Sequence, residues 1–125
     1  MSTRTAICSC GRLSAVCAGD PALVSLCHCT ECQKRTGSPF GIAAFFLRER
    51  VTAEGPSTRF TRQSDSGFPV TFHFCSNCGS TVFWEPKRKP DMIAVAVGAF
   101  ADPDFPAPSK EANVEFGHAW VKHDI

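Results

Sequence analysis

The sequence lacks a long hydrophobic run. Its longest uninterrupted apolar stretches, such as residues 42–47, have six residues, whereas a membrane-spanning helix needs about 20. Hydrophobic residues make up 43% of the chain and charged residues 20%, which are proportions typical of globular proteins. The composition therefore excludes a membrane-spanning helix and a wholly disordered chain. A length of 125 residues fits one compact unit, so we expect a single domain over residues 1–125.

The sequence also lacks an excess of charge of either sign. Thirteen Lys and Arg residues face twelve Asp and Glu residues, which gives a formal net charge of +1. Proteins that bind phosphate backbones usually show a clear basic excess. We therefore expect no nucleic-acid partner and no membrane partner.

The first residues have no apolar stretch that could serve as a secretory signal, so we expect a cytoplasmic protein. Eight of the 125 residues are cysteine, a share below the roughly 8–10% that marks disulfide scaffolds. In a reducing compartment, clustered cysteines serve as metal ligands more often than as disulfides. The cysteine count therefore points to bound metal.

Short runs rich in Val, Ile, Phe and Thr alternate with Gly and Pro turn signals, and each run predicts a strand. The expected strands cover residues 4–8, 13–18, 23–26, 41–47, 59–62, 70–74, 81–84 and 92–97. Only residues 30–36 can form one or two helical turns, and the proline-rich residues 102–108 predict an extended surface connection. The pattern is that of an all-β chain with antiparallel pairing and little helix.

Three clusters hold seven of the eight cysteines. The clusters are Cys8-Ser9-Cys10-Gly11, Cys27-His28-Cys29-Thr30-Glu31-Cys32 and Cys75-Ser76-Asn77-Cys78-Gly79. Two cysteines separated by two residues can turn both sulfurs toward one ion, and a following glycine allows the tight turn. Two cysteines separated by one residue at a strand end point to the same face and can do the same. Each cluster can therefore contribute ligands to a metal ion.

The spacing suggests how the seven ligands divide. Cys27, Cys29 and Cys32 lie within six residues, so binding one ion closes only short loops at little entropic cost. The remaining pairs complete a four-thiolate site, which we expect to be structural. These pairs are Cys8 with Cys10 and Cys75 with Cys78. A site with three protein ligands keeps one coordination position open, which is typical of catalytic zinc.

Two residues near these clusters have plainer interpretations. Cys17 shares a strand face with Leu13 and Ala15, so we expect a small buried side chain, with closure of the second metal site as the alternative. His28 lies between two ligand cysteines and should point away from them in an extended knuckle. We therefore expect His28 to support the site or to face the substrate, and not to be a ligand.

Other candidates are expected to be solvated. His73 should be the outward residue of its strand, and His118 and His123 should face solvent near the C-terminal end. The basic run at residues 87–89 is most simply a soluble loop tip between two prolines. Cys75 and Cys78 can also be interpreted as a redox dithiol, but no βαβ pattern surrounds them.

With these clusters in place, the chain resembles the glutathione-dependent formaldehyde-activating enzyme (GFA) family, which includes centromere protein V. The similarity runs from about Cys8 to Trp120. It is carried by the three cysteine clusters, by Thr36-Gly37-Ser38-Pro39-Phe40, and by Val95-Ala96-Val97-Gly98-Ala99-Phe100 followed by Asp102-Pro103. Several spaced motifs in one order make the resemblance specific.

The resemblance implies an all-β fold of twisted antiparallel sheets, a β-tent, forming one zinc-binding domain. It also implies two zinc ions, one on Cys8, Cys10, Cys75 and Cys78 and a second on Cys27, Cys29 and Cys32. We expect the second ion to be the more labile, because three protein ligands hold an ion less tightly than four thiolates. The family's activity is the joining of formaldehyde to glutathione to give S-hydroxymethylglutathione, formally a carbon–sulfur lyase reaction. The partners implied are a small thiol such as glutathione and a small aldehyde.

Three functional interpretations follow. The first is a zinc-dependent lyase of glutathione–aldehyde adducts, in which the open site on Cys27, Cys29 and Cys32 is catalytic. The second is a zinc-stapled, non-catalytic binding module whose second metal is structural or vestigial. The third, a nucleic-acid-binding ribbon, is disfavoured by the low net charge. Candidate partners for the substrate carboxylates are basic residues near the clusters, with Arg35 first, followed by Lys34, Arg48 and Arg50.

Overall fold

The structure, a computed structural model, describes residues 1–122 and 125. The strands are β1 (Thr3–Ile7), β2 (Ser14–Ala18), β3 (Leu23–Cys27), β4 (Gly41–Leu47), β5 (Val51–Glu54), β6 (Ser57–Gln63), β7 (Pro69–Cys75), β8 (Thr81–Pro86), β9 (Met92–Ala96) and β10 (Lys110–Ala112). The helical segments are α1 (Thr30–Thr36) and the 3-10 turns η1 (Arg48–Arg50), η2 (Val97–Phe100) and η3 (Val114–Phe116). The expected all-β class is confirmed.

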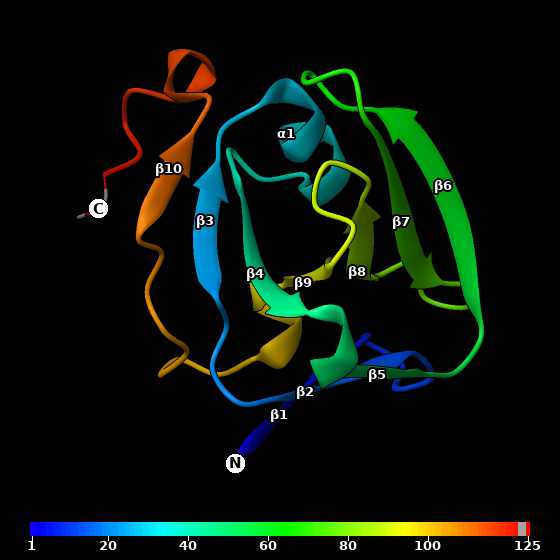
Figure 1. Cartoon of the computed structure of the whole chain (residues 1–125). Coiled ribbons are helices and arrows are strands. Elements are labelled where there is room, and N and C mark those ends of the chain that lie inside the picture. The colour runs from blue at the N-terminus through cyan, green and yellow to red at the C-terminus, as the bar shows by residue number, and fades with distance from the viewer. Residues whose placement is uncertain (123–124) are drawn as a thin grey trace.

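Two sheets form the fold. The smaller has the order β1-β2-β5, and the larger has the order β10-β3-β4-β9-β8-β7-β6. Figure 1 shows the smaller sheet at the bottom of the view, with α1 at the opposite end, above the strands of the larger sheet. Every pairing is antiparallel except that of β10 with β3, which is parallel.

Most strands lie where the hydrophobic runs predict them, within a few residues at each end. Residues 30–36 form α1, and residues 102–108 form no strand. Two strands were not predicted. The β5 strand is largely exposed, and β10 has only three residues with the sequence Lys-Glu-Ala, so neither shows the apolar alternation by which a strand is recognised.

The core is built on both faces of the larger sheet. One cluster lies between the two sheets and includes the fully buried Leu13, Phe46 and Val82. A second cluster on the larger sheet includes Phe72 and Trp84. Within the described residues, no helix is long and apolar enough to cross a membrane.

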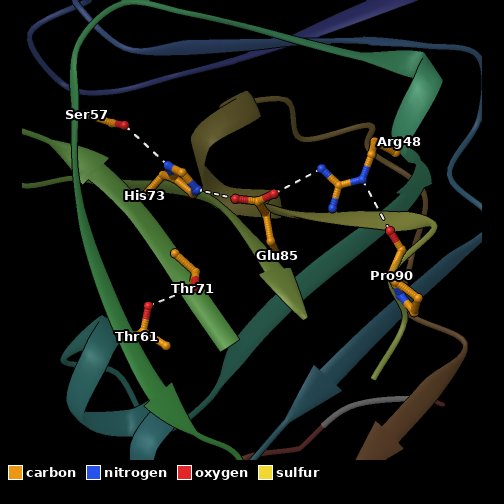
Figure 2. Close-up of polar contacts among 7 residues, drawn as sticks. All are labelled: Arg48, Ser57, Thr61, Thr71, His73, Glu85 and Pro90. Carbon is orange, nitrogen blue, oxygen red and sulfur yellow. Dashed lines mark hydrogen bonds and ion pairs between the residues drawn. The ribbon is translucent and has the colours of Figure 1, made fainter. Parts of the chain in front are cut away.

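His73 shows the consequence of a sheet that is buried on two sides. The expectation that His73 faces solvent is wrong, because its side chain is only 5% exposed and its ring stacks on Phe83 at a centroid distance of 4.4 Å. Its Nε2 lies 2.6 Å from Glu85 Oε2, and its Nδ1 lies 3.3 Å from Ser57 Oγ. Figure 2 shows how Arg48 extends this chain of contacts, donating to Glu85 at 3.0 Å and to the Pro90 carbonyl at 3.2 Å.

The other histidines differ in exposure. His118 is exposed, as predicted, and its Nε2 lies 3.1 Å from Gln33 Oε1. His123 lies outside the described residues. Cys17 is completely buried, as predicted, and burial raises the pKa of its thiol to about 11. A thiol with that pKa is unreactive at neutral pH.

Candidate metal centres and substrate cavity

The three-cysteine cluster forms where β3 ends and α1 begins. Cys27 is the last residue of β3, Cys29 is the N-cap of α1, and Cys32 lies in its first turn. Cys29 Sγ accepts a hydrogen bond from the backbone N–H of Cys32 at 3.2 Å, in the way a serine or aspartate side chain caps a helix. The turn of the helix thereby brings the three sulfurs within 4.8 Å of one another.

These three sulfurs cannot all ionise without a cation. The Sγ atoms of Cys29 and Cys32 are 2.9 Å apart, and two thiolates about 4 Å apart repel by roughly 4 kcal/mol at an effective dielectric constant of about 20. Contacts with Cys29 and then Cys32 lower the pKa of Cys27 to about 2, whereas contacts with Cys27 and Cys29 raise the pKa of Cys32. Without a cation, one sulfur is therefore a thiolate and the other two stay protonated and donate to it. A divalent cation would allow all three sulfurs to ionise.

The four-cysteine cluster joins the two sheets. Cys8 and Cys10 follow β1 in the smaller sheet, and Cys75 ends β7 in the larger one. Cys10 Sγ lies 3.7 Å from Cys8 Sγ and 3.5 Å from Cys75 Sγ. A tetrahedral zinc site with bonds of about 2.3 Å places its sulfurs about 3.8 Å apart, so the observed spacing fits a zinc ion.

Hydrogen bonds to the sulfurs support metal binding at both clusters. The backbone N–H groups of Leu13 and Cys78 donate to sulfurs of the four-cysteine cluster, at 3.2 Å and 3.5 Å. The side-chain amide of Asn113 donates to Cys27 Sγ at 3.2 Å. The Ser80 hydroxyl, 3.4 Å from Cys78 Sγ, lowers the pKa of Cys78 to about 5. Both clusters could hold a metal ion, and their donor atoms are those zinc prefers.

The three-cysteine cluster opens into a cavity of about 320 Å³, whose walls include all three cysteines and the aromatic rings of Phe45 and Trp84. A larger cavity, of about 800 Å³, lies beside Cys8 and Cys78 of the other cluster. The smaller cavity joins an incomplete set of metal ligands to a half-open hollow that can bind a small molecule.

Arg35 lies in the wall between the two cavities and lines both. Its guanidinium lies 4.3 Å from the ring centroid of Trp84, and its buried Nε has no hydrogen-bond partner among the described residues. Burial lowers the pKa of Arg35, while the nearby charge of Cys32 opposes that shift. A partly buried cation that lines the cavity beside the cysteines is placed to receive an anionic group.

Of the four basic residues that the sequence suggested for substrate binding, only Arg35 lines the cavity of the three-cysteine cluster. Lys34 forms an exposed ion pair with Glu31, at 3.3 Å. Arg48 is paired with Glu85 at 3.0 Å, and Arg50 donates to the sulfur of Met1. These three side chains contact other parts of the chain.

Four further cations line this cavity and were not predicted. They are Arg62, Arg88, Lys89 and Lys110. Residues 87–89 lie in a turn, as predicted, with Lys87 and Arg88 exposed and Lys89 partly buried, and Arg88 and Lys89 also line the cavity. The run stands out in the sequence, but its position beside the cysteines depends on pairings between distant strands.

His28 lies in the chain between Cys27 and Cys29 but outside the group of three sulfurs that could hold an ion. It is 3% exposed, and its Nε2 lies 2.7 Å from Glu111 Oε2 in β10. Its backbone carbonyl accepts a hydrogen bond from the Gln33 side chain at 2.9 Å. These contacts tie the turn that carries Cys27 and Cys29 to both β10 and α1.

Comparison with known proteins gives a family and a fold. The family model described as glutathione-dependent formaldehyde-activating enzyme matches residues 3–122. A crystal structure of a Rhodobacter sphaeroides protein superposes with a TM-score of 0.64 at 18% sequence identity, covering 86% of this chain and 98% of that one. At that identity the superposition establishes the fold alone. No curated protein matches the sequence.

Proposed function

This chain belongs to the glutathione-dependent formaldehyde-activating enzyme family, and from that premise we propose that it is a zinc-dependent carbon–sulfur lyase. Its substrates would be adducts of a small thiol, such as glutathione, with formaldehyde or a related small aldehyde. The observation that carries the proposal is the three-cysteine cluster, whose residues line a cavity of about 320 Å³.

In the direction of synthesis, the thiol sulfur attacks the carbonyl carbon of the aldehyde. A carbon–sulfur bond forms, the carbonyl π bond breaks, and the oxygen takes the proton that the thiol gives up, so an S-hydroxymethyl adduct results. A zinc ion held by Cys27, Cys29 and Cys32 would supply a Lewis acid that favours the thiolate form of the substrate. The reverse reaction breaks the same bond.

The chain's own residues would contribute mainly position. The uncatalysed addition is already feasible, so holding the two reactants together is the principal gain. Arg35 would bind a substrate carboxylate, and the rings of Phe45 and Trp84 would exclude water from one side of the cavity. His28 and Asn113 would fix the cysteine turn, through Glu111 and Cys27 respectively.

The test is adduct formation from glutathione and formaldehyde, followed by proton NMR exchange, with zinc-loaded protein. We expect exchange faster than the uncatalysed rate, and loss of that gain in Cys29→Ala. Cys17→Ala is the matched control, because Cys17 is buried outside both clusters. With cobalt in place of zinc, glutathione should change the charge-transfer spectrum of the wild type. If millimolar glutathione changes neither the rate nor the spectrum, the lyase proposal fails for this substrate.

The alternative is a zinc-stapled binding module without catalysis. The backbone hydrogen bonds to the sulfurs of the four-cysteine cluster favour a structural role for that cluster. A purely structural protein, however, would not need the cavity beside the three-cysteine cluster. Metal binding at both clusters, together with a rate equal to the uncatalysed one, would favour the module.

Two further proposals concern the whole chain. We take residues 1–125 as one zinc-binding domain, which is supported by a core cluster shared between the two sheets. We also take the protein to be cytoplasmic and without a nucleic-acid partner. Its eight free cysteines support a reducing compartment, and its net charge of +1 supports the absence of a polyanionic partner.

A further inference from the structure

Besides Arg35, four cations line the cavity that holds the three-cysteine cluster. Arg62 comes from β6, Arg88 and Lys89 from the turn between β8 and β9, and Lys110 from the start of β10. We call these four residues the cationic rim. They come from three separate parts of the chain, so they meet at this place only because the sheet brings them together.

The cationic rim has little opposing charge. No carboxylate pairs with any of its four side chains within the part of the chain that the structure describes. Asp65 is the one acidic residue among those that line the cavity. Elsewhere in the described residues, Arg4, Lys34 and Arg48 each have a carboxylate partner, whereas Arg12, Arg50 and Arg59 have none. The rim therefore differs from other unpaired basic residues by its place at the cavity of the three-cysteine cluster.

Like charges gathered in this way repel one another. Burial lowers the pKa of Lys89, and the charges of Lys110 and Arg88 lower it further. Two rim side chains also lie over aromatic rings, with Lys89 Nζ 4.6 Å from the centroid of Phe45 and the Arg62 guanidinium 5.2 Å from that of Phe72. The rings hold the cations at the cavity while leaving their N–H groups available to an anion.

We propose that the cationic rim determines substrate specificity by pairing with carboxylates, so that thiols carrying two or more negative charges are preferred over neutral thiols of equal size. The assignment of this role to thiols rests on the proposed function. The recognition of negative charge by the rim does not rest on the proposed function, because a ligand without a thiol group can show it. Arg88 and Lys89 are the specificity-determining residues most open to test, since their turn has no part in the core.

The probe is S-methylglutathione, which keeps both carboxylates of glutathione but has no thiol for the metal. Its binding to zinc-loaded, full-length protein is measured by calorimetry, beside its dimethyl ester, which has lost both negative charges. We expect the ester to bind at least about tenfold more weakly. The affinity of the acid should fall as salt rises from about 50 to about 500 mM, because rim and ligand are exposed to screening.

The matched variants share one turn. Arg88→Gln and Lys89→Gln together should weaken S-methylglutathione binding about tenfold. Lys87→Gln removes a neighbouring charge from the same run. Because Lys87 does not line the cavity, this change should alter binding less than about twofold. Thermal unfolding and metal content should match the wild type in both the double variant and Lys87→Gln.

The outcomes separate the two proposals. The role of the rim would be overturned by equal binding of acid and ester, by no binding of either, or by equal effects of Lys87→Gln and of Arg88→Gln with Lys89→Gln. Charge-dependent binding without any acceleration of adduct formation would support the rim while the lyase proposal fails. In an active enzyme, the rim variants should raise KM for glutathione and leave kcat unchanged. If the rim variants left both KM and kcat unchanged in an active enzyme, the proposed role of the rim would fail and the lyase proposal would stand.

Discussion

Arg35 occupies its position because residue 41 has no side chain. A Cβ built on Gly41 would lie 2.8 Å from an Arg35 guanidinium nitrogen and 3.5 Å from Cys32 Cβ. Gly41 begins β4 opposite Cys27, the last residue of β3. One glycine therefore lets the strand pair close to the cysteines while the guanidinium passes over it toward Trp84.

At this scale we predict that Gly41→Ala displaces Arg35 without unfolding the protein, since the end of a long side chain moves at little cost. Glutathione should bind about tenfold more weakly, which is typical of a lost charged hydrogen bond. Trp84 fluorescence, measured in a Trp120→Phe background, should change because the cation leaves its ring. Gly98→Ala is the control, as a Cβ there meets open space. Unchanged fluorescence and binding would contradict the prediction.

At the scale of elements, the turn at Gly55 carries the chain from β5 in the smaller sheet to β6 in the larger one. Gly55 has a φ of 100°, in the region that favours glycine, and a Cβ there would lie 1.8 Å from the Arg12 carbonyl oxygen. Both the conformation and the close backbone approach therefore require glycine.

Gly55→Ala should destabilise the fold by roughly 3 kcal/mol or more, combining about 1–2 for the left-handed conformation with about 1–3 for the overlap. Gly67→Ala measures the cost of the left-handed conformation alone, because Gly67 has a φ of 86° and a Cβ there would meet open space. Denaturant unfolding of both variants measures the difference. Equal destabilisation would show that the turn simply moves away from Arg12.

A second feature at the scale of elements is the chain of contacts from His73 through Glu85 to Arg48. These contacts link β7, β8 and η1 (Figure 2). Burial favours the neutral form of Glu85, but hydrogen bonds from His73 and Arg48, with their charges, outweigh it and hold the pKa of Glu85 below its usual value. The ionised carboxylate thus stabilises the folded state.

In Glu85→Gln, the free energy of unfolding should therefore decrease less in acid than it does in the wild type. Because the folded pKa lies below the unfolded one, this contribution is present above the unfolded value of about 4.3 and is lost as pH falls through the folded value. Unfolding between pH 7 and pH 3 should show a larger decline in the wild type than in the variant. Metal loss affects both proteins alike, so parallel curves would contradict the assignment.

These elements also show how far sequence reasoning reaches. The division of cysteines into four and three follows from local spacing, and α1 follows from a short polar run between two strands. His73 was misjudged because alternation along a strand assumes one solvent-facing side, and here both sides are covered. The cationic rim was missed because Lys110 reaches the cavity through the parallel pairing of β10 with β3, which no local pattern encodes.

At the scale of the whole molecule, the two cysteine clusters have different places. The four-cysteine cluster joins the turn after β1 to the turn after β7, about half the chain apart in sequence. The three-cysteine cluster lies within six residues at one end of the larger sheet. A metal that closes a long loop stabilises a fold more than one that closes a short loop. We therefore expect their losses to have unequal effects.

Cys75→Ser should yield unfolded or insoluble protein, because Cys75 is buried, contacts Cys10 Sγ at 3.5 Å and anchors the junction between the sheets. Cys32→Ser is the matched variant, removing one sulfur from the other cluster. It should stay folded, as judged by circular dichroism, and should release one metal to a chelator at equilibrium. Equilibrium competition is the right measurement because Cys10 and Cys78 are exposed, and exposure alters the rate of metal loss more than the affinity. If Cys75→Ser keeps the melting temperature and metal content of the wild type, or if Cys32→Ser unfolds in its place, the structural role belongs to the three-cysteine cluster.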